Sequence, residues 1–185
     1  MTSRYAGRGD DSEGGQALTE KVVDIRRVAK VVKGGRHLTF SAMVVVGDGK
    51  GRVGVGLGKA PAIPDAVRKG VTIAQKSLVE IQLHGTTIPH VVRSKYGAAE
   101  VLVKPAPSGT GIIAGASVRA VIELAGVKDV VTKSLRSQNP INVVKATLKA
   151  LKALELPARY KVAKATPAEA PVPESAGEEP ATSEA

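Results

Sequence analysis

VVGDGKGRVGVGLGKA, residues 45–60, is the stretch of this sequence that decides its fold. It begins with a cluster of turn-forming residues, GDGKG (47–51), and continues as a segment with a period of two, RVGVGLGK (52–59). The alternation places three apolar residues on one face of a strand and three glycines on the other: Val53, Val55 and Leu57 against Gly54, Gly56 and Gly58. We therefore expect a tight turn followed by a strand with one bare face.

Two further strands are predicted on the amino-terminal side of this segment. EKVVDIRRVAKVV (20–32) is rich in β-branched residues with interleaved charges, and HLTFSAMVVVG (37–47) alternates or runs apolar. The residues between them, KGG (33–35), are a turn signal. The sequence thus predicts an antiparallel hairpin whose tip carries Lys33 and Arg36 beside two glycines.

A helix is predicted after Pro61 and Pro64, because the apolar period changes there. One helical stripe has spacings of 4, 3, 4 and 3, and consists of Val67, Val71, Ala74, Leu78 and Ile81. Three antiparallel strands with one covering helix make a small sheet domain, which we place at residues 19–84.

The next segment, residues 85–156, predicts a small α/β domain of two layers. A strand (VLVKPAP, 101–107) is followed by a glycine-rich loop (SGTGIIAG, 108–115) and by a helix that ends near Gly126. Another strand (VKDVVTKSLR, 127–136) precedes a helix with Asn139 as N-cap and Pro140 in its first turn. The predicted fold class is therefore α+β.

Both ends of the chain are predicted to lie outside the two domains. Residues 1–18 contain little that could be buried, and we expect a flexible arm. Residues 157–185 are dominated by Ala, Pro and Glu without periodicity, which predicts a disordered acidic tail.

Composition narrows the classes of function that the chain can have. The 185 residues are 43% apolar, 2% aromatic and free of cysteine, which excludes disulfides, thiolate nucleophiles and thiolate metal sites. The three histidines, His37, His84 and His90, have no partner at a helical spacing, so we expect no metal site. No apolar run is long enough to span a bilayer, and we expect a cytoplasmic protein without a membrane partner.

Charge points to a polyanionic partner. Residues 21–164 hold 25 Lys or Arg and 8 Asp or Glu, a net charge of +17 within a whole-chain charge of +10. A surface this positive repels itself unless a polyanion compensates it, and nucleic acid is the usual compensating partner. The sequence therefore favours RNA or DNA binding over small-molecule chemistry.

Two glycine-rich loops are candidate phosphate sites. Residues 49–54 (GKGRVG) match the dinucleotide pattern GxGxxG, but a strand follows where that pattern needs a helix. A glycine-rich hairpin fits this segment better. Its cations Lys50, Arg52 and Lys59 beside bare backbone also allow the hairpin to face RNA. Residues 107–111 (PSGTG) precede a predicted helix and are a stronger candidate cradle, although no pair of carboxylates accompanies them as phosphotransfer would require. Two other interpretations of this loop are a tight turn that allows close packing and a contact surface for RNA or protein.

Candidate RNA contacts are dominated by cations at or near glycine-rich turns. Glycines let a backbone approach phosphates closely, and cations neutralise them. The predicted set is Arg26, Arg27, Lys33, Gly34, Gly35, Arg36, Lys50, Arg52, Lys59, Arg68, Lys69, Lys133, Arg136 and Asn139.

The order of the motifs resembles one known family. VKGGR (32–36), VVGDGKGRVGVGLGKA (45–60), GTGIIAG (109–115), RAVIELAGV (119–127) and NPINVVKATLKAL (139–151) are similar to bacterial ribosomal small-subunit protein five. The resemblance runs through about residues 20–155. It implies an N-terminal domain like a double-stranded-RNA-binding fold, and a C-terminal α/β domain shared with a translocase domain and with small-metabolite kinases.

The resemblance also implies a function and partners. A member of the family is a structural constituent of the small ribosomal subunit and no enzyme, binds small-subunit ribosomal RNA without a cofactor, and supports assembly. It lines the path along which messenger RNA enters and influences decoding accuracy. Its protein neighbours are small-subunit proteins four and eight, with Gly111 and Arg119 at the protein-four interface, and its hairpin reaches head RNA near the spectinomycin site.

Two alternatives to this function are kept. One is a free RNA chaperone or double-stranded-RNA binder, which belongs to the same class of RNA-binding proteins. The other is a small phosphotransferase that would use residues 105–115. Sedimentation with small ribosomal subunits and nucleotide binding by the purified chain discriminate among them.

Overall fold

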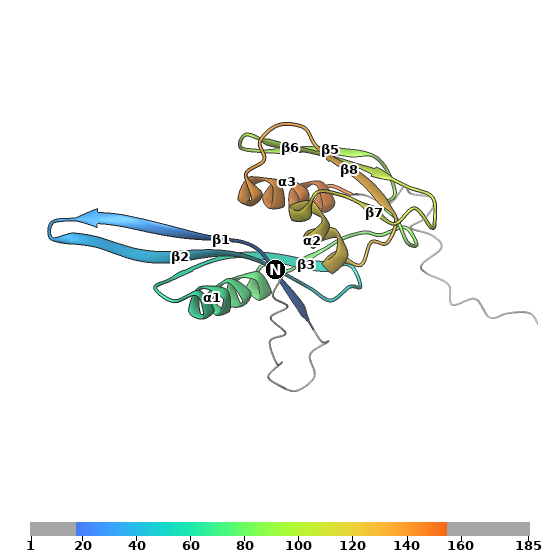
Figure 1. Ribbon diagram of the computed structural model, residues 1–185. Coiled ribbons are helices and arrows are strands. Elements are labelled where there is room, and N and C mark those ends of the chain that lie inside the picture. Colours follow the sequence, from blue (N-terminus) through green and yellow to red (C-terminus); the bar gives the residue numbers. More distant parts are fainter. Residues whose placement is uncertain (1–17, 155–185) are drawn as a thin grey trace, which may run out of the picture.

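The computed structural model describes residues 18–154, and the structured part has four layers (Figure 1). A helix covers one sheet, two helices pack on the opposite face of that sheet, and a second sheet covers these helices. The predicted acidic tail and the predicted arm up to residue 17 lie outside the described residues. The α+β class predicted from the sequence is confirmed.

The first sheet is antiparallel and has the order β1-β2-β3-β4. Its strands are β1 (Thr19–Val32), β2 (Gly35–Gly47), β3 (Arg52–Ala60) and β4 (Val79–Glu80). The three predicted strands are present, and β4 is a two-residue addition that pairs with the start of β3. Sequence patterning missed β4 because two residues are too few to show a period.

The first helix, α1 (Ile63–Lys76), lies directly on the bare face of β3. A β-carbon built on Gly54, Gly56 or Gly58 would lie only 2.2, 2.0 or 1.9 Å from a carbonyl oxygen of α1. Such a close approach leaves room only for small residues on the helix. The buried face of α1 is accordingly Ala66, Gly70 and Ala74.

The predicted apolar stripe of this helix was therefore partly wrong. Val67 and Val71 are half-buried beside the contact, because glycines on the sheet select small side chains at its centre. The helix also ends earlier than the stripe predicts, at Lys76. Ile81 lies beyond β4 and is buried in the core on the other side of the sheet.

The second sheet has the order β5-β6-β8-β7 and is covered on one face by two helices. Its strands are β5 (Val92–Tyr96), β6 (Ala99–Pro105), β7 (Ile112–Ile113) and β8 (Val130–Ser134). The helices are α2 (Ala116–Ala125) and α3 (Pro140–Lys152). The sequence predicted neither β5 nor β7 as a defined strand, and β7 lies within the predicted glycine-rich loop 108–115.

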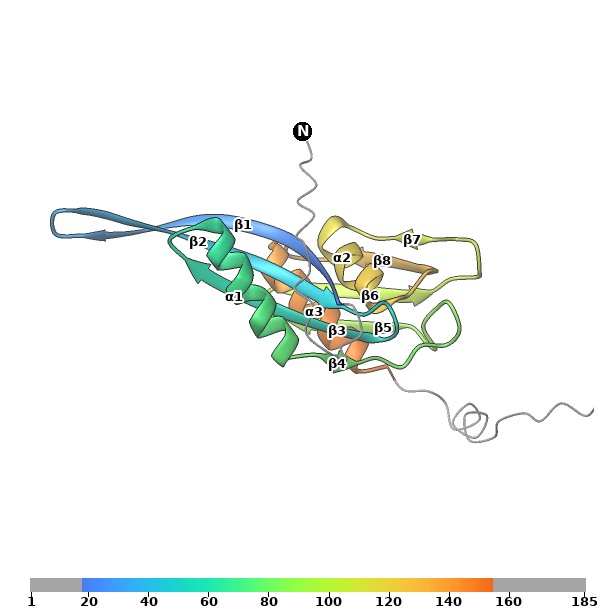
Figure 2. The ribbon, with the colours of Figure 1, turned by 90° about the horizontal axis from the view of Figure 1, so that it is seen from below.

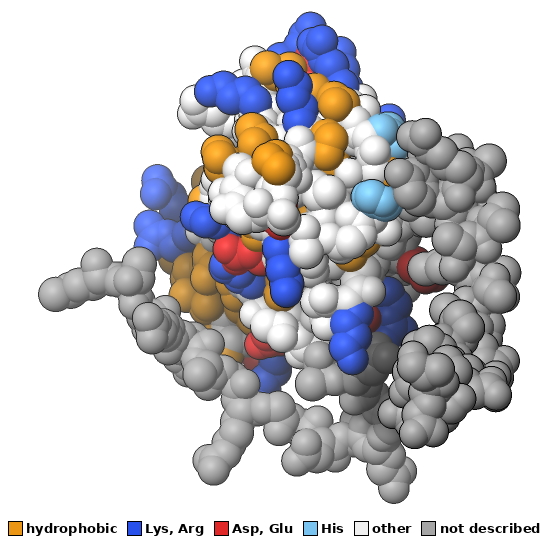
Figure 3. Space-filling view, turned by 90° about the vertical axis from the view of Figure 1, so that its right-hand side faces the viewer, with side chains coloured by type: hydrophobic (Ala, Val, Ile, Leu, Met, Phe, Trp, Pro, Cys, Tyr) orange, Lys and Arg blue, Asp and Glu red, His pale blue; other side chains and the backbone are white. Residues whose placement is uncertain are grey.

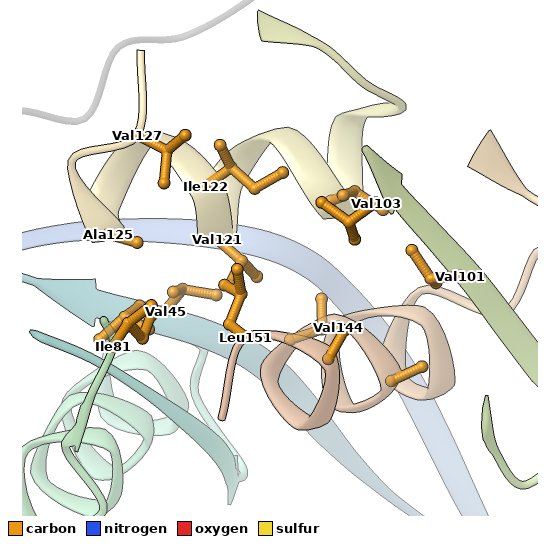
Figure 4. Close-up of a cluster of buried hydrophobic side chains, with 14 of the residues drawn as sticks. Val45, Ile81, Val101, Val103, Val121, Ile122, Ala125, Val127, Val144 and Leu151 are labelled. Carbon is orange, nitrogen blue, oxygen red and sulfur yellow. The ribbon is translucent and has the colours of Figure 1, made fainter. Parts of the chain in front are cut away.

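One hydrophobic core joins the two sheets (Figure 4). Val45 from β2 and Ile81 after β4 lie in the same cluster as Val121 from α2 and Leu151 from α3. Val101 from β6 completes the cluster on the side of the second sheet. The two halves of the chain therefore share the apolar burial that stabilises them.

The β2–β3 loop connects the halves a second time, through the backbone. The amides of Gly49 and Gly51 donate to the carbonyls of Leu124 and Ala125, each at 3.0 Å. These two carbonyls belong to the last turn of α2, where backbone carbonyls find no N–H donor within the helix. The helix ends at Gly126, with a φ of 87°, as predicted from the sequence.

Candidate nucleic-acid interface

The β1–β2 hairpin extends well beyond the part of the first sheet that α1 covers (Figures 1 and 2). Val32 pairs with Gly35, so the turn consists of Lys33 and Gly34. Gly34 has a φ of 92°, in the left-handed region that favours glycine. Every residue of the tip from Lys33 to Arg36 is exposed. The chain thus carries a protruding basic tip, and its contact with RNA stays a prediction.

Cations lie on both faces of this ribbon. Residues paired across antiparallel strands point to the same face. Lys30 pairs with His37 on one face, whereas Arg27 and Arg36 lie on the other, where Arg36 is opposite Val31. Val31 is 74% exposed. The distal ribbon therefore presents charge and apolar surface on two sides, and no other helix or strand of the described range 18–154 packs on its tip.

Arg26 and Asn139, both predicted RNA contacts, are brought together at the base of the hairpin. Arg26 donates to Asp24 at 2.7 Å and to the Asn139 side-chain oxygen at 3.0 Å. Asn139 occupies the predicted N-cap position of α3, but its side chain makes no capping hydrogen bond. The pair ties the ribbon to the second half of the chain.

The backbone amides of the loop GDGKG (47–51) donate hydrogen bonds to acceptors within the protein. Asp48 Oδ1 accepts the amides of Lys50 and Arg52 at 2.8 and 3.0 Å, and its Oδ2 accepts Arg52 Nε at 2.8 Å. Burial of Asp48 acts to raise its pKa, but these hydrogen bonds outweigh burial and the pKa lies below its ordinary value. Since Gly49 and Gly51 donate to α2, no amide from 49 to 52 is left for a phosphate.

The second glycine-rich loop is filled by a carboxylate of the same chain. Asp129 Oδ1 accepts the amides of Gly109 and Gly111, each at 3.0 Å. The hydrogen bond from Gly111, together with one from the Thr86 side chain, holds the pKa of Asp129 below its ordinary value. This buried aspartate occupies the place that a ligand phosphate would need. Sequence reasoning missed it, because Asp129 lies far along the chain from the loop.

The other predicted RNA contacts fall at three places. Lys59, Arg68 and Lys69 line one shallow groove at the edge of the first sheet. Lys50 is exposed in the β2–β3 loop. Lys133 lies on β8 of the second sheet, and Arg136 lies two residues after the end of that strand. The bare glycine face of β3, considered as RNA-facing, is instead covered by α1.

Gly111 and Arg119, the predicted protein-interface residues, lie on either side of β7. Gly111 has a φ of 75°, and no heavy atom lies within 4 Å of the place for its β-carbon, so strain and not crowding within this chain favours glycine. Arg119 is exposed on α2 and pairs with Glu123 at 3.1 Å. Glu123 also pairs with Lys21 of β1 at 2.5 Å.

Two properties of the described part bear on other classes of function. Within residues 18–154, no three His, Asp or Glu side chains gather as metal ligands would. No helix in that range is long and apolar enough to cross a membrane.

The architecture defines an α+β protein with two joined domains and a strongly basic surface. Residues 18–82 match the family model described as ribosomal protein S5, N-terminal domain, and residues 94–166 match that of ribosomal protein S5, C-terminal domain. The chain belongs to the ribosomal protein S5 family, as the resemblance implied. Members of this family are structural proteins of the small ribosomal subunit and bind its ribosomal RNA.

Proposed function

We propose that this chain holds ribosomal RNA of the small subunit with its β1–β2 ribbon and thereby supports assembly of the subunit. The proposed place of action is the ribosome in the cytoplasm. The observation that carries this proposal is the ribbon itself, which ends in a tip of Lys33, two glycines and Arg36.

Physical chemistry explains why the ribbon needs a partner. An isolated two-stranded hairpin is marginally stable in water, and this one exposes apolar side chains such as Val31 near its tip. Cations on both faces allow RNA segments to contact it from two sides. A partner of this kind would neutralise the charge and cover the apolar atoms at the same time.

The finer roles that we propose concern messenger RNA and protein neighbours. We propose that the chain lines the path along which messenger RNA enters, and that small-subunit proteins four and eight are its neighbours. The surface around Gly111 and Arg119 is proposed to contact protein four and to tune decoding accuracy. Its support is the exposure of Arg119 beside a left-handed glycine at the edge of the second sheet.

Nothing in the described residues favours the phosphotransferase alternative. Its proposed cradle, 105–115, donates the amides of Gly109 and Gly111 to Asp129. A free RNA chaperone differs from the proposal in location, and sedimentation of the cellular protein with small ribosomal subunits separates the two.

The test reverses the charge of the tip with Lys33→Glu and Arg36→Glu. Because both side chains are exposed, we expect the free energy of unfolding to change by less than about 0.5 kcal/mol, while binding to small-subunit ribosomal RNA weakens. The matched control is Lys33→Arg with Arg36→Lys, which keeps the charge and should keep binding. A charge-reversed protein that unfolds much earlier yet binds RNA normally would assign the tip a structural role instead.

A further inference from the structure

The second sheet has an outer face that none of the helices within residues 18–154 covers (Figure 1). Residues of β6 that point inward, such as Val101 and Val103, are buried against the helices. The register therefore places their neighbours on the outer face, together with their partners on β5 and β8. Four cations lie on this face and a fifth lies two residues after the end of β8: Arg93, Lys95, Lys104 and Lys133, and then Arg136.

One carboxylate organises two of these cations. Glu100 Oε1 accepts a hydrogen bond from Arg93 Nε, and Oε2 accepts one from Arg136 Nε at 2.7 Å. The Glu100 side chain is only 10% exposed, whereas each arginine side chain is 61% exposed. The arginines thus shield Glu100 from water and stay accessible themselves.

Arg93 and Arg136 are held by Glu100 in a way that leaves their terminal guanidinium nitrogens available to a ligand. Each guanidinium uses Nε toward Glu100, and neither makes another hydrogen bond within residues 18–154. The two terminal nitrogens of each arginine therefore stay available as donors. Such a planar fork matches two oxygens of a phosphate, and fixing it in advance reduces the entropy lost on binding.

We propose that this outer face is a second RNA-binding surface, in which Glu100 positions Arg93 and Arg136 to grip phosphates of the RNA backbone. The inference rests on the proposed RNA-binding function and adds a surface that the β1–β2 ribbon does not contain. Figure 3 shows Lys and Arg side chains, with hydrophobic ones between them, at the upper end of the molecule, which is the side of the second sheet in Figure 1.

Charge complementarity selects RNA over a protein as the occupant. At the outward positions of the three strands, Glu100 is the only acidic residue, and its charge is already matched by two arginines. The exposed residues there are cationic apart from Leu135, which is 44% exposed after β8. Two apolar residues, Leu102 and Val131, also point outward and are half-buried beside these cations. No aromatic residue of the three strands lies at an outward position, whereas a protein interface of standard type is enriched in aromatic anchors.

Two variants test the proposal in the full chain, with a fully paired RNA duplex of arbitrary sequence as the probe. In the first, Arg93→Gln with Arg136→Gln, the slope of log affinity against log salt should become shallower by about 1.4 to 1.8, as for two lost phosphate contacts. The matched control, Lys128→Gln with Lys152→Gln, removes the same charge from exposed positions outside this face and should leave the slope unchanged.

The second variant, Glu100→Gln, separates positioning from net charge. Removing a negative charge would tighten RNA binding if charge alone mattered, but we expect weaker binding because the two forks are released. Thermal unfolding checks that this variant folds. If it does not, Arg93→Lys with Arg136→Lys keeps the charge, removes the fork geometry, and should also weaken binding.

The outcomes also separate this surface from the ribbon. If Lys33→Glu with Arg36→Glu leaves binding to small-subunit ribosomal RNA unchanged while the sheet variants weaken duplex binding, the ribbon proposal fails and the sheet proposal stands. An unchanged salt slope in Arg93→Gln with Arg136→Gln overturns the sheet proposal, as does tighter binding by Glu100→Gln.

Discussion

Replacing Gly56 by alanine tests whether the bare face of β3 belongs to α1 or to RNA. In the structure, a β-carbon on Gly56 would lie 2.0 Å from the carbonyl oxygen of Gly70 and 2.7 Å from the amide nitrogen of Ala74. Real β-carbons essentially never approach other heavy atoms closer than 3.0 Å. The helix would therefore have to move away from the sheet by about 1 Å, which opens its packing.

The magnitude follows from the nature of the clash. Overpacking a core typically costs about 1 to 3 kcal/mol, and here the crowded atoms are backbone atoms, which cannot move aside by changing a rotamer. We expect a loss of about 3 kcal/mol in the free energy of unfolding. For a chain of this length such a loss lowers the midpoint of thermal unfolding by about 6 to 12 °C.

The assay is urea unfolding of the purified full chain, followed by circular dichroism. Gly115→Ala is the matched control, because its φ is −67° and nothing lies within 4 Å of its β-carbon. Because Gly115 is the N-cap of α2 and alanine caps a helix less well than glycine, this control should lose no more than about 1 kcal/mol, well short of Gly56→Ala. If Gly56→Ala instead unfolds with Gly115→Ala and loses RNA affinity, the glycine face meets RNA and the packing argument is refuted.

Three further predictions concern charge. Arg119→Leu should alter the frequency of misreading while ribosomes still assemble, and an unaltered frequency would contradict the interface role. Deleting residues 165–185, which carry a net charge of −5, should leave RNA affinity equal or slightly higher in a salt titration. Asp48, Glu100 and Asp129 have pKa values below their ordinary range, so the unfolded chain binds more protons. The stability that they contribute should be present above about pH 4 to 5 and be lost as the pH falls through their folded-state pKa values; urea unfolding between pH 7 and pH 3 checks this.

Patterns confined to one element were predicted well from the sequence. The alternation at 53–58 predicted β3 and its bare face, and Gly126 predicted the end of α2. Both features depend on neighbouring residues, which a sequence displays directly. The tip at 33–36 was predicted for the same reason, since a glycine pair between two β-rich segments determines a turn locally.

Features that depend on distant residues were not predicted. The alternation predicted the bare face of β3, but only the structure shows that α1 packs on it. Likewise, Gly109 and Gly111 have the composition of a phosphate loop, and their partner is an aspartate 18 to 20 residues later. β5 was missed because its five residues become a strand through pairing with β6.

The joined core gives the two proposed RNA surfaces a common consequence. A β-carbon on Gly126 would lie 2.1 Å from the carbonyl oxygen of Gly49, so the β2–β3 loop and the end of α2 meet in direct backbone contact. Together with the core that both sheets share, this contact holds the ribbon and the outer face of the second sheet in one orientation. Once RNA binds one surface, a segment of the same RNA reaches the other at a high effective concentration. A protein whose sites are individually weak and sequence-independent can in this way fix the relative orientation of two RNA segments, which is the physical requirement for a constituent that supports assembly.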